Sequence, residues 1–196
     1  MTAASLSAPR GLTFASPGPG TPGHVAVEML RTRTKSRLNH VPFEGGGPAL
    51  DALIAGRVDM YFAVLPSAMP HVADGKLKIL GVSSAKRSLA APNVLTVAEQ
   101  TGIRGFALTN WVGVFAPRGT PTDVVARLNR EINQVLAQPD VVEQLVRHGA
   151  EATPMSVDQF AAFLKSESSK YEGLLRDEFC ANFLLYGGCP GSVALP

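Results

Sequence analysis

The positions of apolar residues follow two different periods along the first half of the chain. Short apolar runs predict strands at residues 12–16, 38–43 and 58–64, with a buried fourth strand at 77–82. Apolar residues at helical spacing predict helices at about residues 24–33, 48–55, 66–73 and 97–101. Because strands alternate with helices, we expect an α/β fold with a mostly parallel sheet.

The second half of the chain has fewer strand signals and more helical ones. Residues 106–116 form an extended, strongly apolar run that is long enough to pass through one sheet into another. Amphipathic helices are predicted at residues 122–138, 139–148 and 156–177. Ser156 and Gln159 have the spacing of a capping box at the start of the last helix. The chain therefore closes in a helix-rich segment.

Composition narrows the class of protein. Among 196 residues, 18 are basic and 16 acidic, and no five basic residues are consecutive, so we expect no nucleic-acid partner. No apolar stretch approaches the roughly 20 residues of a membrane span. The first nine residues lack the basic start and apolar centre of a secretory signal. Taken alone, the chain is expected to stay in the cytoplasm.

Two glycine-rich turns are the strongest candidates for binding. They are the first turn, residues 16–21 (SPGPGT), and the second turn, residues 44–47 (EGGG). Each follows a predicted strand and opens a helix, at the carboxyl ends of strands where open α/β sheets bind ligands, and N–H groups and helix dipoles there favour an anion. The candidate ligand-binding residues are Ser16, Gly18, Gly20, Thr21, His24, Gly45, Gly46 and Gly47. The alternative, that both are ordinary turns, stays open.

Nucleotide-binding and catalytic motifs are absent from the sequence. The first turn lacks the lysine of a P-loop, the second does not match G-x-G-x-x-G, and Glu44 would repel a phosphate. The four histidines are scattered without metal-ligand spacing, so we predict no metal, no cofactor and no catalytic residue. Two interpretations stay open for each of three residues, and one of the three is the candidate His24. His24 either reaches a ligand carboxylate or caps a helix, Asp59 contacts a ligand or forms a structural hydrogen bond, and Trp111 walls a cleft or packs in the core.

An ordered series of short segments points to one family. The segments are LTFASPGPG (12–20), VPFEGGGPAL (41–50), GRVD (56–59), LPSAMP (65–70), GKL (75–77), SAKR (84–87), FAPRGTP (115–121), LNREI (128–132) and GAEA (149–152). Together, over about residues 11–177, they resemble the Bug family, the extracytoplasmic substrate-binding proteins of tripartite tricarboxylate transporters.

The resemblance implies both a fold and a function. It implies a two-lobed clamshell of the periplasmic-binding-protein type 2 class, which closes on a small carboxylate and passes it to membrane permease subunits. It also implies a periplasmic solute-binding component that is not an enzyme. The family's anion loop of lobe two corresponds to residues 16–21, and its second glycine turn to residues 45–47. Ala63 stands where the family commonly has an acidic or amide side chain, a departure that bears on ligand selection.

The same resemblance divides the chain into four parts. We expect a disordered N-terminus at 1–10, a complete lobe two at 11–108, the crossing strand and helical remainder of lobe one at 109–177, and an unrelated tail at 178–196. Cys180 and Cys189, in that tail, are interpreted as incidental thiols, with a disulfide as the alternative. The family's secretory signal and the start of lobe one are expected to be missing from a truncated chain.

Three consequences are expected from this truncation. The apolar faces of the later helices should be partly exposed, ligand binding should be impaired, and the chain should be poorly soluble or self-associate. Two other functions stay open. One is an α/β enzyme that acts on a phosphorylated or carboxylated small molecule through His24 or Asp59. The other is a non-functional gene remnant.

Overall fold

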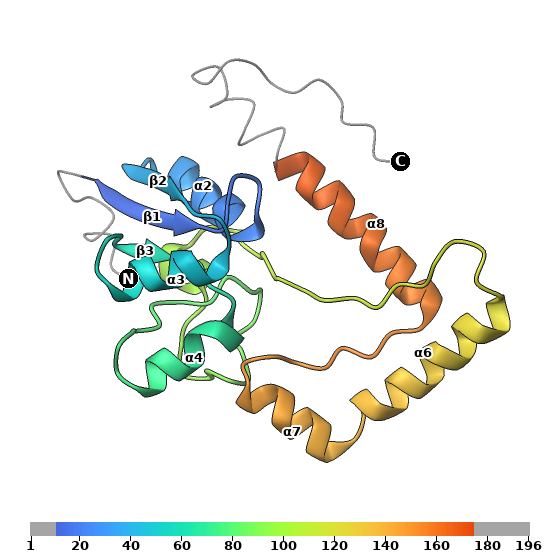
Figure 1. The fold of residues 1–196 in the computed structure, drawn as a ribbon. Coiled ribbons are helices and arrows are strands. Elements are labelled where there is room, and N and C mark those ends of the chain that lie inside the picture. The colour runs from blue at the N-terminus through green and yellow to red at the C-terminus, as the bar shows by residue number, and fades with distance from the viewer. Residues whose placement is uncertain (1–10, 175–196) are drawn as a thin grey trace.

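A three-stranded parallel sheet forms the centre of the first half of the molecule (Figure 1). The computed structural model describes residues 11–174, so the predicted N-terminal segment, the predicted tail and both cysteines lie outside the described residues. The strands are β1 (Leu12–Ser16), β2 (Leu38–Pro42) and β3 (Met60–Tyr61), in the order β2-β1-β3. The predicted parallel α/β arrangement and the first three predicted strands are confirmed, although β3 is shorter than expected.

Helices follow the strands as the apolar spacing predicted. In the first half they are α2 (Pro22–Thr34), α3 (Gly46–Ile54), α4 (Leu65–Ala73) and α5 (Val97–Thr101). In the second half they are α6 (Thr122–Leu136), α7 (Pro139–Arg147) and α8 (Val157–Leu174). The predicted capping box of α8 is present, because Gln159 N donates to Ser156 Oγ at 3.2 Å and Ser156 N donates to Gln159 Oε1 at 2.9 Å.

The core lies on both faces of β1, the central strand. Phe14 belongs to the apolar cluster that contains Val25 and Leu30 of α2, whereas Ala15 belongs to the cluster that contains Ala49 of α3. Successive residues of a strand point to opposite faces, so neighbouring side chains of β1 enter different clusters. Because β1 is covered on both faces, its successive residues Phe14 and Ala15 are both apolar, which explains why β1 was readily predicted.

Two predictions of extended structure are wrong. Within the predicted fourth strand only Val82 forms a bridge, to Thr96, and Leu80 is 44% exposed. The 106–116 run contains no strand either, and Val112 within it is 96% exposed. An apolar run becomes a strand only where a neighbouring strand pairs with its N–H and C=O groups. Among residues 11–174, the first segment has such a neighbour only at Val82, and the second forms no ladder with another strand.

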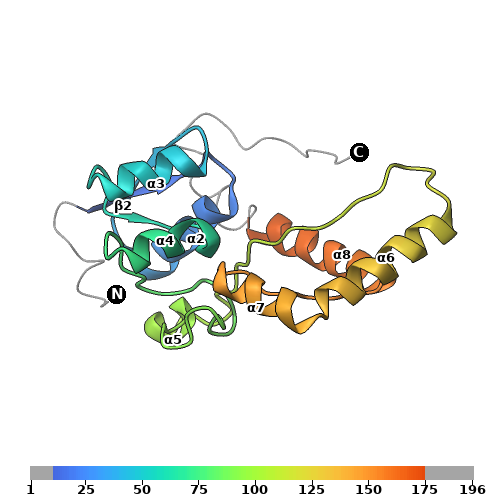
Figure 2. The same cartoon turned by 60° about the horizontal axis from the view of Figure 1, so that its bottom comes forward.

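Residues 109–174 form an arm beside the sheet (Figure 2). None of the residues of α6, α7 or α8 is buried, and Leu128 and Val135 are about half exposed, at 48% and 50%. The arm meets the first half where Tyr171 and Leu174 pack against the cluster of Phe14, as the figures also show for α8 beside α2. Apolar side chains of α6 are therefore partly exposed in this structure, while the truncation given as the cause and the division near residue 108 stay predictions.

Candidate functional site

The two predicted turns lie next to each other at one edge of the sheet. Ser16, the last residue of β1, is in register with Pro42, the last residue of β2. Phe43 N donates a hydrogen bond to Ser16 O at 2.9 Å, so the two segments are still paired where the strands end. The carboxyl ends of parallel strands thus bring the first turn, the second turn and the N-termini of α2 and α3 to the same edge.

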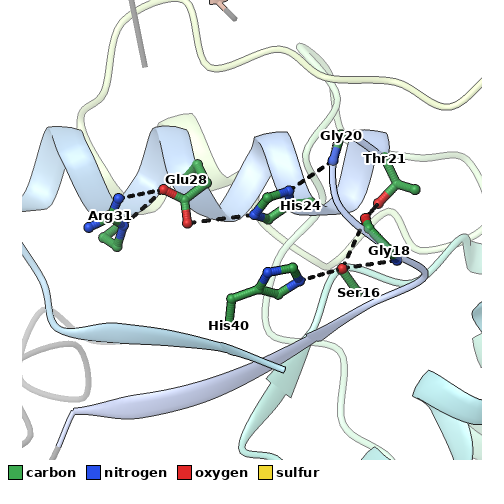
Figure 3. A network of polar contacts seen from close by, with 8 residues as sticks. All are labelled: Ser16, Gly18, Gly20, Thr21, His24, Glu28, Arg31 and His40. Atoms are coloured by element: carbon green, nitrogen blue, oxygen red, sulfur yellow. Dashed lines mark hydrogen bonds and ion pairs between the residues drawn. The ribbon is translucent and has the colours of Figure 1, made fainter. Parts of the chain in front are cut away.

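The first turn is closed by hydrogen bonds within itself (Figure 3). Gly18 N donates to Ser16 Oγ at 3.1 Å, and Thr21 Oγ1 donates to Gly18 O at 2.8 Å. Gly18 and Gly20 have φ angles of 134° and 78°, which residues with a Cβ rarely adopt. The turn therefore has a defined shape, and the amide of Gly18 is already bonded in this conformation.

His24 lies inside the first turn. The residue lies at the N-terminal end of α2, and only 6% of it is exposed. Nδ1 accepts a hydrogen bond from Gly20 N at 3.0 Å, so the ring proton sits on Nε2, which is 3.8 Å from Glu28 Oε1. Burial, together with the nearby His40 and Arg31, lowers the pKa of His24 to about 4. At neutral pH His24 is therefore an uncharged acceptor for the turn.

The second turn presents an uncapped helix N-terminus. Gly45 is the N-cap of α3, with a φ of 113°, and no side chain caps the helix. Ala49 N makes the first bond back to the turn, to Gly45 O at 3.4 Å, so Gly46 and Gly47 come before the first closed helical turn. Both residues are exposed. This arrangement offers backbone donors and the positive end of a helix dipole to an anion.

Two residues at this edge were not predicted as site residues. A Cβ placed on Gly46 would lie 3.3 Å from Tyr61 Oη, so the phenol lies against the second turn. Burial raises the pKa of Tyr61, which keeps its hydroxyl a donor. His40 Nε2 lies 2.6 Å from Ser16 Oγ, beneath the first turn. No local pattern could have shown these positions, because they depend on the register with β1, in which His40 pairs with Phe14 and Tyr61 pairs with Ala15.

Asp59 and Trp111 have structural partners away from this edge. Asp59 Oδ2 accepts hydrogen bonds from Thr13 N and Thr13 Oγ1, both at 2.7 Å, near the start of β1. The backbone hydrogen bond from Thr13, and then its hydroxyl, lower the pKa of the Asp59 carboxyl. Trp111 Nε1 donates to Glu167 Oε2 at 3.2 Å, and its ring meets Phe163 edge to face. The structural interpretation fits Asp59, whereas Trp111 is partly exposed and packs on α8 outside both core clusters.

Two other classes of feature were searched for in residues 11–174. No group of three His, Cys, Asp or Glu side chains there is placed to hold a metal ion. None of the helices in the same range combines the length and apolar character needed to cross a bilayer.

The comparisons with known proteins identify the family. The model of the tripartite tricarboxylate transporter family receptor matches residues 2–178. The chain belongs to this receptor family. A UPF0065 protein from Pseudomonas sp. (strain P51), in the tcbD-tcbE intergenic region, is 42% identical over 167 residues, which are 85% of this chain and 50% of that protein. The chain thus spans about half the length of the curated relatives it matches.

Solved receptors of similar structure include two with bound acids. R. palustris Rpa4515, solved with adipate, is 30% identical with a TM-score of 0.79, over 84% of this chain and 55% of that one. MatC from Rhodopseudomonas palustris, solved with malate, is 34% identical with a TM-score of 0.70, over 84% and 56%. The fold is therefore that of the family's periplasmic binding proteins, and the prediction of a receptor family rather than an enzyme is confirmed.

Proposed function

We propose that the chain is the solute-binding component of a tripartite tricarboxylate-type transporter and binds a small carboxylate at the edge formed by the first and second turns. The observation that supports this most directly is the meeting of two helix N-termini without side-chain caps, those of α2 and α3, at one sheet edge. Each N-terminus concentrates partial positive charge, and a carboxylate is the anion that the related R. palustris structures contain.

The groups at this edge fit a singly charged oxygen acceptor better than a phosphate. The donors nearest the second turn are the exposed amides of Gly46 and Gly47 and the hydroxyl of Tyr61. The exposed Glu44 adds negative charge next to them. Each carboxylate group of a small acid carries a single charge and accepts such hydrogen bonds, whereas a phosphate group gathers more charge on one centre and meets stronger repulsion from Glu44.

Affinity of the isolated chain is expected to be low. Binding pockets usually enclose about 70–90% of the surface of a small ligand. The edge described here covers a ligand from one side, so we expect a Kd well above about 1 μM, which corresponds to roughly −8 kcal/mol. In transport the bound carboxylate would be passed to membrane permease subunits in the periplasm, the compartment in which the family's solved members work.

The proposal is tested by calorimetric titration of residues 1–196 with malate, adipate and inorganic phosphate. Gly47→Asp places a carboxylate in the first turn of α3, where it stabilises the helix dipole but repels an anion. Gly47→Asn has nearly the same shape and no charge, and a Cβ at Gly47 has nothing within 4 Å. We expect binding of the two acids to weaken about tenfold in Gly47→Asp relative to Gly47→Asn, at unchanged or higher melting temperature.

Two outcomes would contradict this proposal. If phosphate binds more tightly than both acids, the ligand class is wrong. If the two Gly47 variants bind malate equally well, the N-terminus of α3 is not part of the site.

A further inference from the structure

The imidazole rings of His24 and His40 lie next to the first turn (Figure 3). The rings of His24 and His40 are stacked with centroids 4.0 Å apart, and the ring of Phe14 stacks on His40 at 4.8 Å. The two imidazoles come from different elements, α2 and β2, and each directs one ring nitrogen at the first turn. His24 Nδ1 meets Gly20 N, and His40 Nε2 meets Ser16 Oγ.

The hydrogen-bond partners fix the role of His24 and favour one role for His40. Gly20 N can only donate, so His24 Nδ1 is the acceptor. Ser16 Oγ has one proton and two acceptors in reach, Gly18 O at 3.1 Å and His40 Nε2 at 2.6 Å. Gly18 O already receives the Thr21 hydroxyl at 2.8 Å. The shorter distance to His40 Nε2 therefore favours donation from Ser16 to His40.

The surroundings keep the two rings uncharged. Glu28 on α2 lies 3.8 Å from His24 Nε2, but its other oxygen accepts Arg31 Nε at 2.9 Å and Arg31 Nη2 at 2.6 Å. Arg31 thus balances the carboxylate that would otherwise stabilise an imidazolium. From β1 the rings meet Phe14 and Ser16, which do not titrate at ordinary pH. Burial is the main cause that lowers the pKa of each histidine.

On the basis of the proposed function, we propose that His24 is a positioning residue for carboxylate binding: by accepting the amide of Gly20 at Nδ1, it holds the first turn in the shape that receives the ligand. His40 supports the same turn through Ser16. His24 is only 6% exposed and acts through the backbone that it orients. This role requires a hydrogen-bond acceptor at the position of His24 Nδ1. An aromatic ring of similar size without that acceptor cannot bind the amide of Gly20.

Two substitutions separate the acceptor from the ring. His24→Asn keeps an oxygen close to the position of Nδ1 but removes the ring from the stack with Phe14 and His40. His24→Phe keeps an aromatic ring for stacking but removes the acceptor. A positioning role predicts that His24→Phe weakens malate binding at least about tenfold and that His24→Asn stays within about threefold of the parent.

The readouts are the malate Kd from calorimetry, the melting temperature, and the exchange rate of the Gly20 amide by NMR. We expect the Gly20 amide to exchange faster in His24→Phe and to stay protected in His24→Asn. Retained binding in His24→Phe with loss in His24→Asn would mean that the ring only packs, and equal binding in both would also overturn the proposal.

The amide measurement separates this inference from the proposed function. Absence of carboxylate binding in the parent chain would remove the proposed function, and with it the ligand part of this inference. The Gly20 exchange rates would still decide whether His24 holds the first turn. Unchanged exchange in His24→Phe, in a parent that does bind malate, would overturn the positioning role alone.

Discussion

The first half of the molecule and the arm are both rich in apolar residues, yet only the first half buries them. Every fully buried apolar side chain among residues 11–174 lies between Phe14 and Leu108. In the arm, α6 and α7 are strongly amphipathic but bury nothing, and Phe115 is 66% exposed. The difference shows that an amphipathic pattern is enough to form a helix, whereas burial needs a second apolar surface facing it.

The largest expected effect on stability comes from removing one aromatic ring from each of the two parts and comparing the losses. Phe14 is fully buried at the centre of the first half, so Phe14→Ala should destabilise the fold by about 3–5 kcal/mol. Phe160 of α8 is only partly buried, beside Trp111 and Phe163, so Phe160→Ala should cost about 1 kcal/mol. Urea denaturation followed by circular dichroism measures both values. Equal losses would mean that the arm is part of the same cooperative core.

Lowering the pH should reduce stability by a smaller amount, and only in the first half of the molecule. The pKa of His24 is lowered from 6.5 to about 4, so the folded state prefers the neutral ring. Above pH 6.5 this preference has no effect on stability. As the pH falls from 6.5 towards 4, the unfolded chain takes up a proton that the folded chain does not, and the free energy of unfolding decreases.

The measurement is hydrogen exchange by mass spectrometry at a series of pH values, corrected for intrinsic rates. Peptides from β1 and α2 should lose protection as the pH falls through this window, while peptides from α6 should not change in step. His24→Asn should flatten the response of β1 and α2. A pH response of the same size in α6 would show that other groups cause it.

Substitutions on the exposed face of α6 should have the smallest effect on stability. Their effect on self-association should be clear. We propose that this face makes the chain self-associate, because Leu128 and Val135 are about half exposed on it. Val135→Glu should shift the molecule towards monomer in sedimentation velocity, with a stability change within about 0.5 kcal/mol. Gln134→Glu adds the same charge one residue away and is the matched control. Equal sedimentation of the two variants would contradict a role for the apolar face.

Much of the fold could be predicted because its signals are local. Short apolar runs identified β1 and β2, and glycine-rich junctions placed both turns at strand ends. The strand predicted at 77–82 was wrong because the residues have the apolar character of a buried strand, while strand pairing depends on a neighbour outside the run. The roles of His24 and His40 were beyond local patterns for the same reason. They depend on β2 lying beside β1, which brings two histidines 16 residues apart into one stack.

The alternation of proline and glycine in the first turn has a consequence for the cost of binding. Pro17 and Pro19 have fixed φ angles and no N–H group, and Gly18 and Gly20 supply the bends between them. Ordering a flexible residue costs about 1–2 kcal/mol of conformational entropy, and here much of that entropy is already absent from the free chain. On the proposed function, a ligand would meet a turn that needs little rearrangement, so ordering the backbone would take little from the free energy of binding.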